Sequence, residues 1–404
     1  MDALDILTDL DNVIPFFQPI FSADEHRAIG YEILGRYKGK EGIESLGPFF
    51  LDDQIPDEYR LEVDNTVLTK ALDLALELDP DVMIFINRDA DILMNDHGEQ
   101  FLQLLLQYAD KGISLNRIVL EISERNYKGD FEHLDHLLNY YRTYGLKVAI
   151  DKVANENSHL DRMGQLAPDI IKVDLQALRS MQNSSSFQDV LYSISLLARK
   201  IGATLLFENI EMVFQLQFAW RNGGRYYQGF YLSEPCDHFV ERDILKDRLK
   251  SECHSFIVSE KKKLEKLYSL TESFQLRLQE FLTKYRKITD YEELLKSLVS
   301  HMSHMAFRVY ICDEEGFQKT PNFFFTQDKW KIQREYENKN WSWRPYFLEN
   351  IIKMRKEQKG ILSDLYSDIE TGETIRTFSY PISANDYLFI DLSYSFLYQQ
   401  EGLL

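Results

Sequence analysis

The sequence predicts an α/β protein in which a (β/α)₈ TIM-like barrel is followed by a helical linker and a smaller α+β domain. Three observations predict this order. Between about residues 13 and 245, eight short apolar runs alternate with helix-length segments, the pattern of a barrel built from strand and helix pairs. A stretch without Gly or Pro then extends from residue 253 to 288. After about residue 290 the composition becomes aromatic and strand-like.

The eight apolar runs of the first region are the predicted barrel strands. The segments between most of them carry apolar residues three and four apart, as amphipathic helices do. An open dinucleotide-binding sheet is a weaker interpretation, because no G-x-G-x-x-G follows the first run and no Walker A loop is present. In chain order the runs read VIPFFQPIF, AIGYEIL, VMIFIN, RIVLEI, LKVAID, IIKVD, TLLFEN and YYQGFYL.

A seven-residue repeat marks the stretch that follows the barrel. Its two interleaved series form an a/d seam, and two interpretations fit it: one long helix packed on its own barrel, or a short dimeric coiled coil. Either would connect two domains, and we expect a barrel domain at residues 1–250, a connecting helix at 251–290 and a further domain at 291–404. The series are Leu264, Thr271, Leu278, Tyr285 and Leu267, Phe274, Phe281, Ile288.

Strand-like words and one helix make up the C-terminal region. The words AFRVYICDEEG, NFFF, TIRTFSYPI and YLFIDLSY predict strands, and residues 346–357 predict a helix. The region resembles a PAS or Cache type sensor domain, most of all in the stretches WSWRPYFLENI and SDLYSDIETGE. The resemblance implies that this domain senses a signal.

Charge and hydropathy limit the classes of partner. The formal net charge of −19 disfavours broad attraction to nucleic acid or to an anionic membrane. The first fourteen residues are acidic, unlike a signal peptide, and no run of eighteen apolar residues occurs. The three cysteines show no paired or metal-ligand spacing. We expect a cytoplasmic protein with no nucleic-acid or membrane partner.

Acids and amides stand where the predicted strands end. Each carboxylate alone is best explained as a helix cap or an exposed turn. Together, at the carboxyl ends of strands in one barrel, they would repel one another unless a cation neutralised them. Hard divalent metals with oxygen ligands, Mg²⁺, Mn²⁺ or Ca²⁺, suit such a ring, although the spacing leaves the reaction open. The residues are Glu32, Asn87, Glu121, Asp151 and Glu208, with Lys172 and Asp174 together in IIKVD.

Eight words of this region resemble, in order, the motif series of the EAL domain, the phosphodiesterase fold that acts on cyclic di-GMP. The words are QPIF, GYEILGR, FIN, LEISE, IDK, PDIIKVD, FENIE and QGFYLSEP. They extend over about 230 residues, and the signature triplet differs only in Ile33, which replaces alanine. The resemblance implies a metal-dependent site for cyclic di-GMP.

The resemblance also implies a role for each matching position. It makes Lys172, Glu208 and Gln228 the catalytic residues, with Lys172 positioning or activating the attacking water, and it makes Glu124 and Glu211 supporting acids. The implied ligands of Mg²⁺ or Mn²⁺, for which Ca²⁺ can substitute, are Glu32, Asn87, Glu121, Asp151 and Glu208. The implied contacts to the dinucleotide are Gln18, Glu32, Leu34, Arg36, Asp174, Glu211, Gln228 and Pro235.

One motif departs from the family pattern. Where the family has Asp-Asp-Phe-Gly-x-Gly, this chain reads DKVANE over residues 151–156, so that Lys152 replaces an acidic metal ligand. A cation at that point opposes a second metal ion. We therefore expect a protein that binds cyclic di-GMP with weak or no hydrolysis. The alternative is an active phosphodiesterase that makes linear pGpG and is regulated by the C-terminal domain.

The order of domains resembles that of the YkuI-like EAL proteins. The stretches LYSISLLARKIGA, WRNGGRYYQG, KNWSWRPYFLEN and TIRTFSYP carry this resemblance, which covers nearly the whole chain. With the heptad seam it implies a homodimer, and a downstream protein partner whose identity the sequence does not reveal.

Overall fold

The computed structural model describes residues 3–40, 42–123, 127–153, 160–176, 184–302, 304–345 and 347–400. The chain divides into two compact units, Met1–Phe256 and Ile257–Leu404. Within the described ranges, we find no helix that is both long and apolar enough to cross a membrane.

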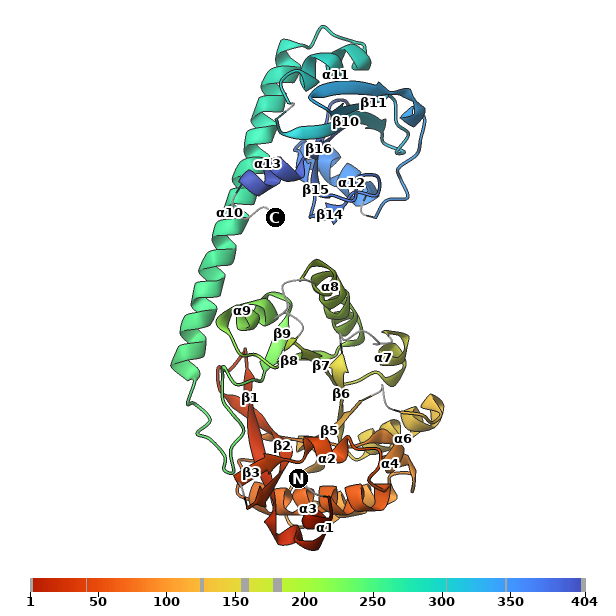
Figure 1. Ribbon diagram of the computed structural model, residues 1–404. Helices are drawn as coiled ribbons and strands as arrows, with labels where there is room; N and C mark the ends of the chain where they lie inside the picture. Colours follow the sequence, from red (N-terminus) through yellow and green to blue (C-terminus); the bar gives the residue numbers. More distant parts are fainter. Residues whose placement is uncertain are drawn as a thin grey trace. The chain divides into compact units, whose positions relative to one another are not determined.

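The first unit is a closed barrel of eight strands with helices around it (Figure 1), which confirms the predicted fold class. One feature differs from the prediction, because β1 runs antiparallel to both of its neighbours, β2 and β9. A short extra strand, β3 (Gly42–Ser45), extends β2 as a hairpin. The barrel strands are β1 (Val13–Ser22), β2 (Ala28–Gly39), β4 (Met83–Asn87), β5 (Ile118–Ile122), β6 (Lys147–Val153), β7 (Ile170–Asp174), β8 (Thr204–Glu208) and β9 (Gly224–Tyr227).

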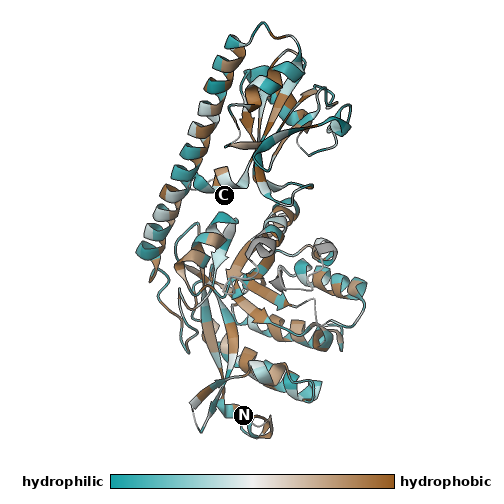
Figure 2. Cartoon of the chain, turned by 45° about the horizontal axis from the view of Figure 1, so that its top comes forward, coloured by the Kyte–Doolittle hydropathy of each residue, from teal (hydrophilic) through white to brown (hydrophobic). Residues whose placement is uncertain are grey.

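The barrel interior has an apolar layer beneath a polar one. Because side chains alternate along a strand, an inward apolar residue lies two positions before an inward polar one on each of the strands β4 to β8. Val119 thus precedes Glu121 on β5, and Leu206 precedes Glu208 on β8. The apolar layer consists of Ile20, Ile29, Met83, Phe85, Val119, Ala149, Ile170 and Leu206. In Figure 2, several strands of the barrel are largely in the brown of hydrophobic residues.

Helices cover the outside of the barrel with their apolar faces. The face of α6, for example, is Leu134, Leu137, Leu138 and Tyr141. This helix is capped by Asp130, whose carboxylate accepts from the amide of Glu132. The helical elements are α1 (Ala3–Thr8), η1 (Leu10–Asn12), α2 (Gly47–Phe50), α3 (Asp57–Ala75), α4 (Ala90–Met94), α5 (Glu99–Asp110), η2 (Leu115–Arg117), α6 (Phe131–Thr143), α7 (Leu160–Leu166), α8 (Ser184–Ile201) and α9 (Val213–Arg221).

The long helix α10 (Lys246–Lys284) supplies side chains to both units. Its first turns bury Leu249 and Phe256 in the core of the barrel unit. Phe274 and Leu278, which belong to the predicted heptad seam, are buried in the core of the second unit. The prediction that the seam packs on the barrel is therefore wrong for these two residues, while the coiled-coil alternative stays a prediction.

The second unit is an antiparallel sheet of seven strands with helices on both faces. Along β10, Val309 and Ile311 pack with residues of α10 and α11, whereas Tyr310 and Cys312 pack with α12. The elements are α11 (Tyr291–Val299), β10 (Ala306–Asp313), β11 (Asn322–Thr326), β12 (Lys329–Gln333), η5 (Arg334–Tyr336), α12 (Phe347–Glu357), β13 (Ile361–Leu362), β14 (Tyr366–Ser367), β15 (Thr374–Pro381), β16 (Asp386–Leu392) and α13 (Tyr394–Gln399). This confirms a smaller mixed domain, and its PAS or Cache character stays a prediction.

Candidate functional site

Four carboxylates converge on one buried lysine at the polar end of the barrel. Lys172, on β7, is only 1% exposed. Its Nζ lies 2.8 Å from Glu121 Oε2, 3.2 Å from Glu32 Oε2, 3.4 Å from Glu208 Oε2 and 3.7 Å from Asp151 Oδ1. Each carboxylate comes from a different strand, so the ring depends on the closure of the barrel. We call these five residues the carboxylate ring.

Amide side chains fix the position of Glu32 in the ring. Asn87 Nδ2 donates to Glu32 Oε1 at 2.7 Å, and Gln228 Nε2 donates to Glu32 Oε2 at 2.6 Å. The same Gln228 nitrogen lies 3.2 Å from Gln18 Oε1. The structure thus brings together predicted residues from β1, β2, the end of β4 and the residue after β9.

The electrostatics of the ring show an excess of negative charge. Burial raises the pKa of Glu208 to about 8, with a further contribution from Asp151. Burial also raises the pKa of Glu121 well above its usual range, and the negative charge of Glu32 adds to this effect. Burial alone would raise the pKa of Glu32, but Lys172 and the two amides lower it. One ammonium group therefore does not neutralise the ring.

The donor set fits a hard divalent cation. The five predicted ligands are all oxygen donors, the type that Mg²⁺, Mn²⁺ and Ca²⁺ prefer. In the described part of the chain, no hydrogen-bond partner is found for four buried oxygens: Glu121 Oε1, Asp151 Oδ1, Glu208 Oε1 and Gln228 Oε1. Among the residues that the structure describes, no three acids, histidines or cysteines are already arranged around one metal position, and the Lys172 ammonium lies where the carboxylates converge. A cation would have to share that position with Lys172 or displace its ammonium.

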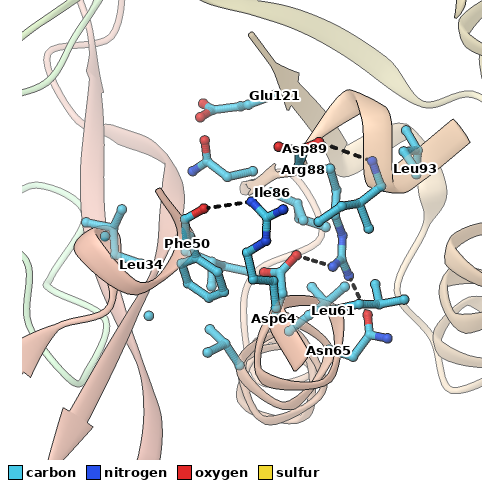
Figure 3. Close-up of a pocket in the computed structure, with 18 of the residues that line it drawn as sticks. Leu34, Phe50, Leu61, Asp64, Asn65, Ile86, Arg88, Asp89, Leu93 and Glu121 are labelled. Atoms are coloured by element: carbon cyan, nitrogen blue, oxygen red, sulfur yellow. Dashed lines mark hydrogen bonds and ion pairs between the residues drawn. The ribbon is translucent and has the colours of Figure 1, made fainter. Parts of the chain in front are cut away.

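A pocket of about 480 Å³ adjoins the ring (Figure 3), a volume typical of small-molecule sites. Seven of the predicted site residues line it: Glu32, Leu34, Arg36, Asn87, Glu121, Asp151 and Glu208. The guanidinium of Arg36 lies over the ring of Phe16, 5.4 Å from its centroid, and donates to the carbonyl oxygen of Gly35. Such a group can bind a phosphate oxygen.

The far wall of the pocket contains polar residues that we did not predict. Arg88, next to Asn87, forms an ion pair with Asp64 of α3 and donates to Asn65 Oδ1 at 2.9 Å (Figure 3). Burial raises the pKa of Asp64 even beside this arginine. Arg88 follows a strand that ends in the ring, and that position was a usable signal. Asp64 looks like a surface residue of a helix, and only the tertiary fold places it in the pocket.

The other predicted residues either do not line the pocket or are not described by the structure. Asp174 is buried at the end of β7, where its Oδ1 accepts from Asn209 Nδ2 at 2.9 Å. The backbone nitrogen of Glu211 donates to Gln215 Oε1 at 2.7 Å. Neither of these residues nor Pro235 lines the pocket. Glu124, the side chain of Lys152 and the loop 154–159 lie outside the described residues.

Comparison with known families identifies the barrel. Residues 2–235 match the model of the EAL domain, and the match covers more than half of the chain. The chain belongs to the EAL domain family. Residues 239–404 match a second model, described as an EAL-domain associated signalling protein domain. Both findings confirm the resemblance drawn from the motifs.

Relatives within the EAL family differ in how much of the chain they match. The uncharacterized EAL-domain containing protein YkuI of Bacillus subtilis is 57% identical over 406 residues, 100% of each chain. Its crystal structure, a complex with the substrate c-di-GMP and calcium, superposes with a TM-score of 0.96 over 100% of both chains. The probable cyclic di-GMP phosphodiesterase PdeG of Escherichia coli is 25% identical over 230 residues, 55% of this chain and 44% of the relative.

Proposed function

We propose that this EAL protein binds cyclic di-GMP together with a divalent cation and hydrolyses it slowly or not at all. The carboxylate ring carries this proposal, because several of its buried oxygens accept no hydrogen bond from the described residues and it lies beside a pocket of about 480 Å³. The likeness to a relative of the same length that was solved with c-di-GMP and calcium supports it.

The geometry suggests a role for each side of the site. Glu32, Asn87, Glu121, Asp151 and Glu208 would hold Mg²⁺, Mn²⁺ or Ca²⁺. A bound cation of this kind polarises a phosphoryl oxygen and acidifies its water. Arg36 would bind a phosphate, and Leu34 would contact the ligand. Arg88 and Asp64, on the far wall, have the donor and acceptor groups that suit the edge of a guanine base.

Lys172 would act as a donor of hydrogen bonds. Burial alone would lower the pKa of this lysine, but the four surrounding carboxylates together raise it well above its usual range. Its ammonium therefore keeps its proton, and it orients an attacking water or a phosphate oxygen without serving as a base. Glu208, Gln228, Gln18 and Asp174 would complete the site around it.

Weak turnover follows from Lys152, the residue after Asp151 on β6. The EAL pattern has an acid there, and a lysine both removes an oxygen ligand and disfavours a second cation. This change should reduce the rate of two-ion phosphodiester cleavage more than it reduces the affinity for the ligand, because binding can use Arg36 and one cation.

Replacing Lys152 with aspartate is expected to raise hydrolysis of cyclic di-GMP by roughly 10²-fold, the size typical of one electrostatic contact to a transition state. The measurement is chromatography of linear pGpG after incubation with Mn²⁺. Lys147→Asp makes the same charge change at the opposite end of β6 and should leave the rate unchanged. Fast hydrolysis by the unaltered chain would support the alternative, an active phosphodiesterase regulated by the C-terminal domain.

The organisation around this site is part of the proposal. We take residues 1–250 as the barrel domain, 251–290 as the connecting helix and 291–404 as a PAS or Cache-like sensor domain in a cytoplasmic homodimer with a downstream protein partner. Exposed apolar side chains at Met212, Val213, Phe214 and Phe230 support self-association, since large exposed apolar groups commonly mark protein contacts.

A further inference from the structure

The first turns of α10 hold the ring and backbone of Tyr231. Its hydroxyl donates to Glu252 Oε1 at 2.7 Å. The guanidinium of Arg248 lies over its ring, 4.1 Å from the centroid, and donates to its carbonyl oxygen at 3.1 Å. Arg248 and Glu252 also pair with each other at 3.1 Å. These three side chains form a closed set of contacts, which we call the Tyr231 clamp.

The turn that carries Tyr231 is bonded to the loop after β8. The amide of Tyr231 donates to the carbonyl oxygen of Ile210 at 2.9 Å, and the amide of Ile210 donates to the carbonyl oxygen of Gln228 at 3.1 Å. Gly229, which lies between Gln228 and Tyr231 in the chain, has φ +151°, and a Cβ there would lie 2.2 Å from the carbonyl oxygen of Ile210. Such close packing leaves the turn little freedom to move independently of its neighbours.

Both ends of this bonded segment reach the carboxylate ring. Gln228, three residues before Tyr231, donates its side-chain amide to Glu32 Oε2 at 2.6 Å. Ile210 lies two residues after Glu208, whose Oε2 is 3.4 Å from Lys172 Nζ. A displacement of Tyr231 would therefore shift a donor to Glu32 and the end of β8 together.

We propose that Tyr231 is a positioning residue through which α10 sets the placement of Gln228 and, through it, Glu32. Since α10 continues into the second unit, a rotation or shift of this helix would change the ring without any new contact at the ring itself. The clamp gives the EAL barrel an input from its C-terminal region. This inference rests on the proposed binding of cyclic di-GMP.

Calorimetric titration of the full-length chain with cyclic di-GMP and Ca²⁺ tests the proposal. Tyr231→Leu removes the ring and the hydroxyl, and we expect roughly tenfold weaker binding. Tyr231→Phe keeps the ring over Arg248 and loses only the bond to Glu252, so its loss should be smaller. Arg248→Gln, which disturbs the clamp from the other side, should weaken binding in the same direction. Tyr140→Phe breaks an exposed tyrosine pair on α6 and serves as the control.

The decisive comparison places each clamp variant in a Gln228→Ala background. If Tyr231 acts mainly through Gln228, its substitution weakens binding much less in this background than in the unaltered chain. A purely structural role predicts the same loss in both backgrounds, and that result, or unchanged binding by Tyr231→Leu and Arg248→Gln, would overturn the inference. Failure of the unaltered chain to bind cyclic di-GMP would instead overturn the proposed function.

Discussion

Lys172→Met is expected to destabilise the metal-free protein by about 3–5 kcal/mol, a fall in melting temperature of about 6–20 °C. The substitution removes a buried cation whose Nζ lies within 3.7 Å of four carboxylates. Those carboxyls then have to repel one another or take up protons. Because protonation becomes harder as the pH rises, the loss should grow as the pH rises toward and through the Glu208 pKa of about 8.

A divalent cation should reverse much of this loss. Ca²⁺ or Mn²⁺ can replace the missing positive charge among the same oxygens, so the melting temperature of Lys172→Met should rise more on metal addition than that of the unaltered chain. Lys70→Met is a matched control, because Lys70 Nζ donates to three backbone carbonyls away from the ring. A variant that melts normally without metal, or that metal fails to stabilise, would contradict the role assigned to Lys172.

Arg308→Met should lower the free energy of unfolding of the second unit by about 3–5 kcal/mol. Arg308 is buried on β10 and contacts Asp368 twice at 2.9 Å, Glu370 at 2.9 Å and Asp391 at 3.0 Å. Without it, Asp368 and Asp391 are buried carboxylates that have lost the guanidinium they both contact. Hydrogen exchange of the β10, β15 and β16 amides, followed by mass spectrometry, measures the loss within this unit.

At acid pH, the difference in stability between Arg308→Met and the unaltered chain should become smaller. Burial opposes ionisation of Asp368, but Arg308 holds its pKa below the usual 3.8, so this pairing stabilises the fold above about pH 4 and is lost as the pH falls further. Arg334→Met, at an exposed arginine paired with Glu292 and Glu337, should change the stability of the unit far less, because solvent screens a surface ion pair. Equal effects of the two substitutions would show that the buried network contributes no special stability.

Much of the barrel and its ring was predictable because strands fix side-chain alternation. An acid or amide two residues after an inward apolar position had to enter the barrel mouth, as Glu121 and Glu208 do. The reversed first strand was also predictable: only five residues separate β1 from β2, fewer than the dozen or so that a parallel crossover needs. We predicted strand positions but missed this consequence of loop length.

Other features depended on distances that no sequence pattern encodes. Lys172 was expected beside a water, yet its contact with four carboxylates depends on the barrel diameter and on the depth of each side chain. Asp64 and Arg88 meet because α3 packs against β1 and β2, and β2 is the neighbour of β4 in the barrel. The burial of Phe274 and Leu278 in the second unit could not be predicted from the heptad pattern. The same pattern suits a helix that packs on another helix and a helix that packs on a sheet.

Calorimetric titration with cyclic di-GMP, in Ca²⁺ and in EDTA, tests the central claim most directly. We expect saturable binding at one site per chain in Ca²⁺, weakened in EDTA, and lost in Glu32→Ala, which removes the carboxylate that Asn87, Gln228 and Lys172 hold. Binding of equal affinity in EDTA or in Glu32→Ala, or no binding by the unaltered chain, would contradict a metal-assisted site built on the carboxylate ring.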